Sequence, residues 1–195
     1  MKNLLLLVLL FLFVSGYGQN ELRTIKGSVH PEKGKMNITI FGFKGGYNKS
    51  IIRGLDTKRE RIGYIGNELY GAFFADTKLN EKLNFENELL FSWTNDYHFI
   101  EVPLHLKYLF TPKWSAFAGL KLDIIADNDN DPIERYYRFR NVGGSVELGA
   151  QFNIIKRLFV ETRYSRGLVN QITDLSFDIN NAKRNTFRFG AGIRF

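Results

Sequence analysis

The last ten residues of the chain, 186–195, constrain the fold more than any other stretch, because apolar residues alternate with polar or small ones up to the end. One face of this segment carries Phe187, Phe189, Ile193 and Phe195. The other face carries two arginines, Arg188 and Arg194. A period of two is typical of a β-strand whose faces meet different surroundings. Water would leave such an aromatic strand fraying, whereas a bilayer would favour it.

The same alternation recurs in seven earlier segments, at residues 38–47, 62–75, 83–93, 99–110, 114–125, 142–154 and 158–165. About eight strands of roughly ten residues have the length that tilted strands need to cross a bilayer. Short connections at 76–82, 111–113 and 153–157 contrast with long ones at 48–61, 126–140 and 167–185. Only the connection between the third and fourth segments breaks this pattern of short turns and long loops. We therefore predict an all-β fold, a closed antiparallel up-and-down transmembrane β-barrel over residues 36–195.

Composition agrees with a barrel and excludes several other classes. Aromatic residues make up 15% of the chain, which suits the aromatic girdles of a membrane barrel. The mean hydropathy of −0.21 argues against a helical membrane protein, but the polar lumen of a barrel also lowers this average. No cysteine is present, so disulfides, thiolate metal sites and a lipoprotein anchor are excluded. A soluble lipocalin-like barrel is the disfavoured alternative, because its outer face would then be lined with Glu and Arg.

The start of the chain predicts an export signal. An apolar run from Leu4 to Val14 follows a lysine and precedes small residues, which is the pattern of a cleaved secretory signal peptide. The run is about half the ~20 residues of a membrane-spanning helix. We place cleavage after Gly18, which gives a signal peptide at 1–18 and a periplasmic lead-in at 19–35.

The polar faces of the predicted strands carry acids and bases in nearly equal numbers. The predicted lumen residues are Lys44, Glu68, Glu86, Glu88, Glu101, His105, Lys107, Lys121, Asp123, Glu147, Glu161, Arg163, Arg188 and Arg194. Side chains fill the interior of an eight-stranded barrel, and an unpaired charge sealed there would be destabilising. We therefore predict a salt-bridged plug, with a small channel as the weaker alternative. His105 could also serve as a catalytic base of an outer-membrane lipid-modifying enzyme, but no nucleophile is placed beside it by spacing.

We attribute most of the formal net charge of +7 to the loops that connect the predicted strands. The predicted basic loops contain Arg53, Lys58, Arg59, Arg61, Arg135, Arg138, Arg140, Lys183 and Arg184. Extracellular loops of this charge would attract outer-membrane lipid and lipopolysaccharide, and export makes nucleic acid a poor partner. No metal or cofactor is predicted, because Pro132 and Arg138 stand where a calcium loop needs Gly and Glu.

Four stretches resemble the PorT-like outer-membrane β-barrel family: GFKGGYNKS at 42–50, KLNEKL at 78–83, IEVPLHLKY at 100–108 and RYSRGLVN at 163–170. The likeness spans essentially the whole chain after the export signal. It implies a small non-enzymatic barrel in a Gram-negative outer membrane. Some members of the family serve protein secretion, so the resemblance also leaves open a protein partner in an envelope complex. Phe195 and the apolar positions before it look like the terminal signal read by the barrel-assembly machinery.

Overall fold

The computed structural model describes residues 38–55, 58, 61–93, 98–125, 142–170, 172–174 and 179–195. Of residues 61–64, 172–174 and 179–181 it describes the backbone alone. The predicted signal peptide at 1–18, the lead-in at 19–35 and the loop at 126–140 lie outside these residues. Within the described part of the chain, no helix is long and apolar enough to cross a membrane.

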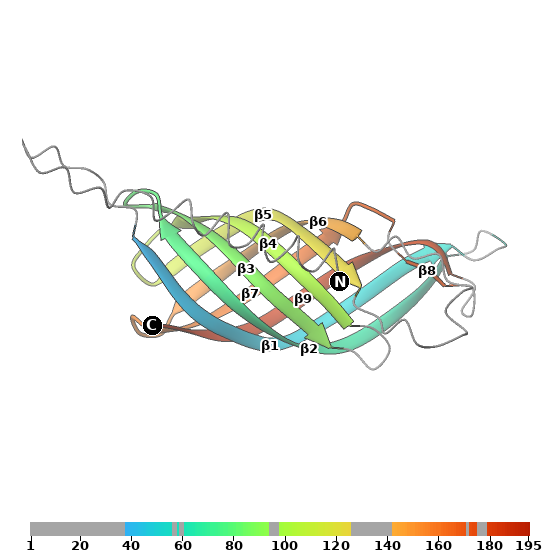
Figure 1. Ribbon diagram of the computed structural model, residues 1–195, viewed down its shortest axis with the longest axis horizontal. Helices are drawn as coiled ribbons and strands as arrows, with labels where there is room; N and C mark the ends of the chain where they lie inside the picture. Colours follow the sequence, from blue (N-terminus) through green and yellow to red (C-terminus); the bar gives the residue numbers. More distant parts are fainter. Residues whose placement is uncertain are drawn as a thin grey trace, which may run out of the picture.

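The described strands form one antiparallel sheet that closes on itself as a barrel (Figure 1). They are β1 (Thr39–Leu55), β2 (Arg61–Lys78), β3 (Leu83–Trp93), β4 (His98–Leu109), β5 (Trp114–Ile125), β6 (Val142–Asn153), β7 (Leu158–Gly167), β8 (Ile172–Asp174) and β9 (Ile179–Arg194). Neighbours in the chain pair from β1 to β7, and β9 then pairs with both β7 and β1. The short β8 pairs only with β9, so eight strands form the wall. The predicted closed all-β barrel is confirmed.

The barrel is polar inside and apolar outside. Side chains on a strand point alternately to its two faces, and here successive residues have opposite exposure. On β2, Leu69 is 66% exposed whereas Glu68 is 2% exposed. On β5, Leu120 is 60% exposed whereas Lys121 is 1% exposed. A few apolar residues also fill the lumen, where Phe74 and Phe159 meet edge to face with ring centroids 5.6 Å apart.

Four strands are longer than the sequence predicts: β2 and β7 by a few residues, and β1 and β9 by more. β1 continues to Leu55, so most of the loop predicted at 48–61 is strand. Asn48 and Ser50 look like loop residues, but both are buried on the lumen face. β9 begins at Ile179 rather than at residue 186, and the loop predicted at 167–185 also contains β8. The prediction failed at these ends because polar lumen residues resemble loop residues in sequence.

At one end of the barrel, some wall strands extend further than others. Pairing between β2 and β3 stops at Leu69 and Trp93, whereas β2 pairs with β1 as far as Arg61. Of the described strands, β2, β1, β9 and β8 continue beyond this point, and they project from the barrel at the right of Figure 1. We call this the extended end. The opposite turn end carries the short connections at 79–82, 110–113 and 154–157.

The seam between β1 and β9 closes the barrel. It runs from the Gly42–Arg194 pair to the Leu55–Asn180 pair. At the turn end, the amide of Phe195 donates a hydrogen bond to the carbonyl oxygen of Phe41 at 3.0 Å. In the middle of the seam Gly190 faces the lumen, where an added Cβ would overlap the hydroxyl of Tyr70. A glycine at this position therefore lets a large lumen side chain lie against the strand backbone.

Candidate functional site

The lumen is filled by buried ionisable side chains. Among the described residues, the acids are Glu68, Asp76, Glu86, Glu88, Glu101, Asp123, Glu147 and Glu161. The buried bases are Lys44, His105, Lys107, Lys121, Arg163, Arg184 and Arg188. Charges removed from water require partners close by, and these groups have them across the lumen.

Lys44 lies at the centre of the charge network near the turn end. Its ammonium Nζ donates to Glu86 at 3.0 Å, Glu88 at 2.8 Å and Glu161 at 3.1 Å. Glu86 and Glu88 come from β3 and Glu161 comes from β7, so this one side chain joins three strands. Its Nζ also lies 5.0 Å from the ring centroid of Phe74, within the range of a cation–π contact. All three donor positions of the ammonium are thus used.

Two further bases complete this part of the network. Arg163 on β7 makes a two-pronged contact with Glu88, in which Nη1 and Nη2 each lie 3.1 Å from a carboxylate oxygen. Lys107 on β4 hydrogen-bonds Asp76 at 3.1 Å and also contacts Glu86. Paired, planar contacts of this kind fix the orientation of the guanidinium as well as its charge.

Glu101 organises the second part of the network, toward the extended end. Its carboxylate accepts from Lys121 at 2.8 Å, Arg184 at 3.0 Å and Arg188 at 2.6 Å. Arg184 also reaches Glu68 at 2.6 Å. Three cations around one carboxylate hold β4, β5 and β9 together across the lumen.

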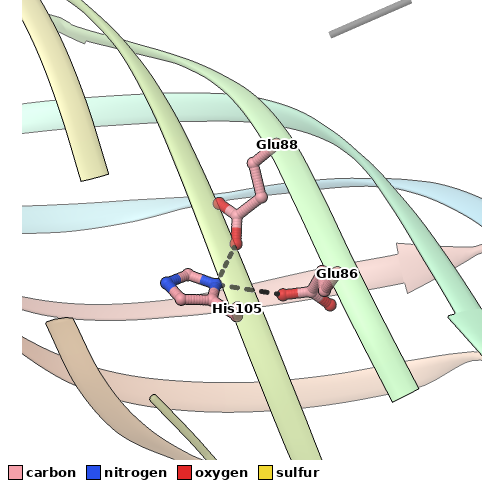
Figure 2. A group of neighbouring side chains, drawn as sticks. All are labelled: Glu86, Glu88 and His105. Atoms are coloured by element: carbon pink, nitrogen blue, oxygen red, sulfur yellow. Dashed lines mark ion pairs between the residues drawn. The ribbon is translucent and has the colours of Figure 1, made fainter. Parts of the chain in front are cut away.

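His105 lies beside Glu86 and Glu88 (Figure 2), and its other ring nitrogen faces Glu147. Its Nε2 is 2.9 Å from Glu147, and its Nδ1 is 3.3 Å from Glu88 and 3.8 Å from Glu86. Glu86, Glu88 and His105 offer ligand atoms within 4.8 Å of one another, which is close enough to hold a metal ion. The same Oε1 atoms of Glu86 and Glu88 already bind the Lys44 ammonium, however. A metal ion at this cluster would therefore have to displace the Lys44 ammonium from both carboxylates.

Among the described residues, no hydroxyl is positioned for His105 to activate it as a nucleophile. A histidine base activates a hydroxyl by accepting its hydrogen bond. The nearby Ser165 hydroxyl instead donates to Glu147 at 2.8 Å and accepts from Thr186 at 2.9 Å. The His105 side chain is fully buried, so its geometry is that of a structural hydrogen-bonding residue.

The structure places most predicted lumen residues inside the barrel and differs at three positions. Arg194 was predicted to face lumen acids, but it lies half-buried at the turn end and donates to Asn153 at 3.0 Å. Arg184 was predicted in a basic loop, but it is a lumen residue of β9. Asp76 was predicted in a turn, but it belongs to β2 and contacts Lys107. The alternation with Thr186 and Arg188 was the signal that could have placed Arg184 inside.

Other predicted basic-loop residues also belong to strands. Arg53 lies on β1, Arg61 on β2 and Lys183 on β9. Lys58 is in the turn between β1 and β2. The other predicted basic-loop residues lie outside the described residues: Arg59, Arg135, Arg138 and Arg140. The proposed assembly-signal residues Phe187, Phe189, Ile193 and Phe195 all point outward and are exposed.

These features define the protein as a closed eight-stranded antiparallel barrel with an apolar outer face and with ion pairs across its lumen. No protein-family model matches the sequence, and no curated protein matches it. Three solved structures illustrate the distant likeness of the fold. Neisserial surface protein A is 12% identical, with a TM-score of 0.48 over 78% of this chain and 97% of that chain.

Two further barrels give similar values. Ail of Yersinia pestis, solved with the heparin analogue sucrose octasulfate, is 13% identical, with a TM-score of 0.47 over 80% of this chain and 99% of its own. The outer membrane protein OprG of Pseudomonas aeruginosa is 12% identical, with a TM-score of 0.38 over 82% of this chain and 97% of its own. Similarity at this level carries no argument about function, and the barrel rests on the chain's own strand pairing.

Proposed function

We propose that the protein is an integral outer-membrane β-barrel of a Gram-negative bacterium, without enzyme activity, whose lumen is a rigid plug and whose role is structural or accessory. One observation carries this proposal: the described outward faces of the strands are apolar and the inward faces are charged. A water-soluble protein rarely exposes apolar patches larger than a few hundred Å². Around this barrel the apolar surface is continuous from strand to strand, which suits hydrocarbon.

The dimensions of the wall support a membrane setting. The strands β3 to β6 contain 11 or 12 residues each. A tilted membrane strand needs ~9–11 residues to cross the hydrocarbon core. The closed sheet also pairs its edges, which a bilayer requires because lipid offers no hydrogen bonds to free backbone groups.

Aromatic side chains gather near both ends of the outer face. At the turn end, Tyr108, Phe110 and Trp114 are exposed. Toward the extended end, Tyr47 and Trp93 are exposed. Membrane barrels carry two such girdles, one at each interface between lipid and water. The separation of these two groups by apolar residues supports a single crossing of the bilayer by each strand.

The ion-paired lumen supports a plug over the channel and enzyme alternatives. Arg163 on β7 reaches Glu88 on β3, and Arg188 on β9 reaches Glu101 on β4, and the two strands of each pair lie on opposite sides of the barrel. Side chains therefore cross the interior rather than line an open passage. Among the described residues, no hydroxyl near His105 is hydrogen-bonded to its ring. A link to secretion, as in some PorT-like proteins, belongs to this proposal only through the sequence resemblance, together with a protein partner in the envelope.

The experiment is to express the full chain in a Gram-negative host, separate the membranes by density and compare boiled with unboiled samples by gel electrophoresis. We expect the protein in the outer-membrane fraction, with an unboiled band that migrates differently because a closed barrel resists detergent. Recovery in the soluble fraction, or identical boiled and unboiled bands, would contradict the proposal. Current through a planar bilayer containing the purified protein would instead support the channel alternative.

The enzyme alternative has its own test. Lipid A from cells that express the wild-type protein is compared with lipid A from cells that express His105→Ala. We expect the same lipid A composition in both. A difference that depends on His105 would overturn the non-enzymatic assignment.

A further inference from the structure

The described charges on the outer face of the barrel wall are all positive. In the eight wall strands, every described Asp and Glu occupies an inward position. Outward lysines and arginines do occur among the described side chains, at Lys49 and Arg53 on β1, Arg166 on β7 and Lys183 on β9. All four are exposed. We call these four residues the outer basic cluster.

The outer basic cluster lies on three adjacent strands at the extended end. Arg53 on β1 pairs directly with Lys183 on β9. Lys49 on β1 pairs with Phe187 on β9, four residues further toward the barrel. Arg166 follows Ser165, the last residue of β7 that pairs with β9. The strand order β7, β9, β1 therefore brings the four cations onto one continuous surface.

The arrangement brings like charges together, and no described acid lies beside them. Side chains directly opposite each other on paired strands have Cβ atoms ~4.5–5.5 Å apart, and like charges there are destabilising. Arg53 and Lys183 are such a pair. None of the four cations forms an ion pair with an acid among the described residues, because the described acids of the wall face the lumen.

An apolar surface adjoins the outer basic cluster on the side of the turn end. Phe187 and Phe189 on β9 and Tyr47 on β1 are exposed and face outward. Phe187 lies beside Lys49, so cation and aromatic ring are neighbours on the same face. A ligand that fits both features carries negative charge at one end and hydrocarbon at the other.

We propose that the outer basic cluster binds the phosphate groups of a lipid headgroup with at least two phosphates, while its acyl chains lie along Phe187 and Phe189. This proposal rests on the membrane assignment made above. Arg53 and Lys183 hold one phosphate between them, since an arginine fork matches two phosphate oxygens. Lys49 lies beside Phe187 on one side of β9, and Arg166 lies on the other side, two residues beyond Tyr164, which is the β7 partner of Phe187. These two cations bind the second phosphate. The four cations lie on three neighbouring strands, and neighbouring strands are ~4.8 Å apart. The cluster is therefore wide enough for more than one phosphate.

The test uses the full-length protein, extracted and purified in a mild detergent. Native mass spectrometry measures retention of lipid A with two phosphates, of dephosphorylated lipid A and of phosphatidylglycerol, with inorganic phosphate as a competitor. The variant is Lys49→Gln/Arg53→Gln/Arg166→Gln/Lys183→Gln. The matched control removes the same charge from exposed turn-end residues: Lys82→Gln/Lys113→Gln/Lys156→Gln/Arg157→Gln.

We expect the wild type and the control to retain bisphosphorylated lipid A, and the cluster variant to lose about tenfold in affinity. Equal losses in the control, or equal retention of phosphatidylglycerol or dephosphorylated lipid A, would overturn the proposal. Displacement by millimolar inorganic phosphate would show a free-phosphate site and also overturn it. Heat-modifiable gel mobility reports whether the cluster variant has folded, and Arg53→Gln/Lys183→Gln replaces it if it has not. A wild type that does not form a barrel would overturn the membrane assignment itself, which is a separate outcome.

Discussion

Replacement of Glu101 by Gln removes the carboxylate that three lumen cations share. Lys121, Arg184 and Arg188 lie 2.8, 3.0 and 2.6 Å from its oxygens. Glutamine keeps the shape of the side chain and loses only the charge. Removal of one partner from a buried ion pair costs about 3–5 kcal/mol, because the other charge stays buried and unpaired.

After the substitution, two of the three cations still contact another acid. This limits the expected loss in the free energy of unfolding. Arg184 retains Glu68 at 2.6 Å, and Arg188 retains Glu147 at 3.6 Å. We therefore expect a loss at the lower end of the range, about 3 kcal/mol in the free energy of unfolding. With a urea dependence of ~2 kcal/mol per molar, the unfolding midpoint would fall by about 1.5 M.

The assay is urea unfolding of the barrel in lipid vesicles, followed by the fluorescence of its two tryptophans, Trp93 and Trp114. The matched control is Glu81→Gln in an exposed turn, for which we expect no shift. The double variant Glu101→Gln/Arg188→Gln should recover part of the loss, because it removes one of the unpaired cations. An unchanged midpoint for Glu101→Gln would refute the reasoning and would mean that lumen water, rather than Glu101, neutralises the cations.

Three further outcomes follow from the barrel. Leu120→Arg places a charge midway along the outer face of β5 and should cost ~2–4 kcal/mol in vesicle unfolding, as expected for the bilayer midplane. Gly190→Ala puts a Cβ 2.7 Å from the carbonyl oxygen of Gly45 and against Tyr70, and should lower stability by ~1–3 kcal/mol. Phe195→Asp should reduce the fraction of heat-modifiable barrel in the outer membrane, if the terminal aromatic is the assembly signal.

Each of these variants has a control. Leu120→Ala shortens the same side chain without adding charge and should unfold closer to the wild type than Leu120→Arg. Gly71→Ala adds a Cβ that meets only the Trp93 ring, at 3.7 Å, so it should be tolerated. Phe195→Leu keeps an apolar terminus and should assemble. Equal behaviour of any variant and its control would contradict the corresponding argument.

The sequence predicts which face of each strand a residue occupies far better than it predicts where the strand ends. β3 and β5 begin and end at the predicted residues, although Asn87 and Leu90 on β3 and Phe117 on β5 interrupt the alternation. The ends of β1 and β9 were missed, since Asn48, Ser50 and Arg184 continue the lumen face with residues that loops also favour. Alternation alone cannot separate a polar lumen from a polar loop.

The sequence also did not predict which lumen acids pair with which lumen bases. Lys44 meets Glu161, which is 117 residues away, because the stagger of the strands brings β1 and β7 to the same height. The sequence indicated that acids and bases were nearly balanced, but balance does not select partners. Only the register of the closed sheet determines that Glu101 has three cations and that Lys44 has three acids.

The seam between β1 and β9 also determines the order of events in folding. β1 is the first wall strand along the chain, yet one of its two neighbours is the last, and the Gly42–Arg194 pair joins residues at opposite ends of the barrel sequence. Contacts so distant in sequence form slowly, because a long loop must close before they can stabilise anything. Until β9 arrives, β1 and β7 each keep an open edge that can pair with another chain. The interval before the β1–β9 seam closes is therefore when this protein is most vulnerable to aggregation.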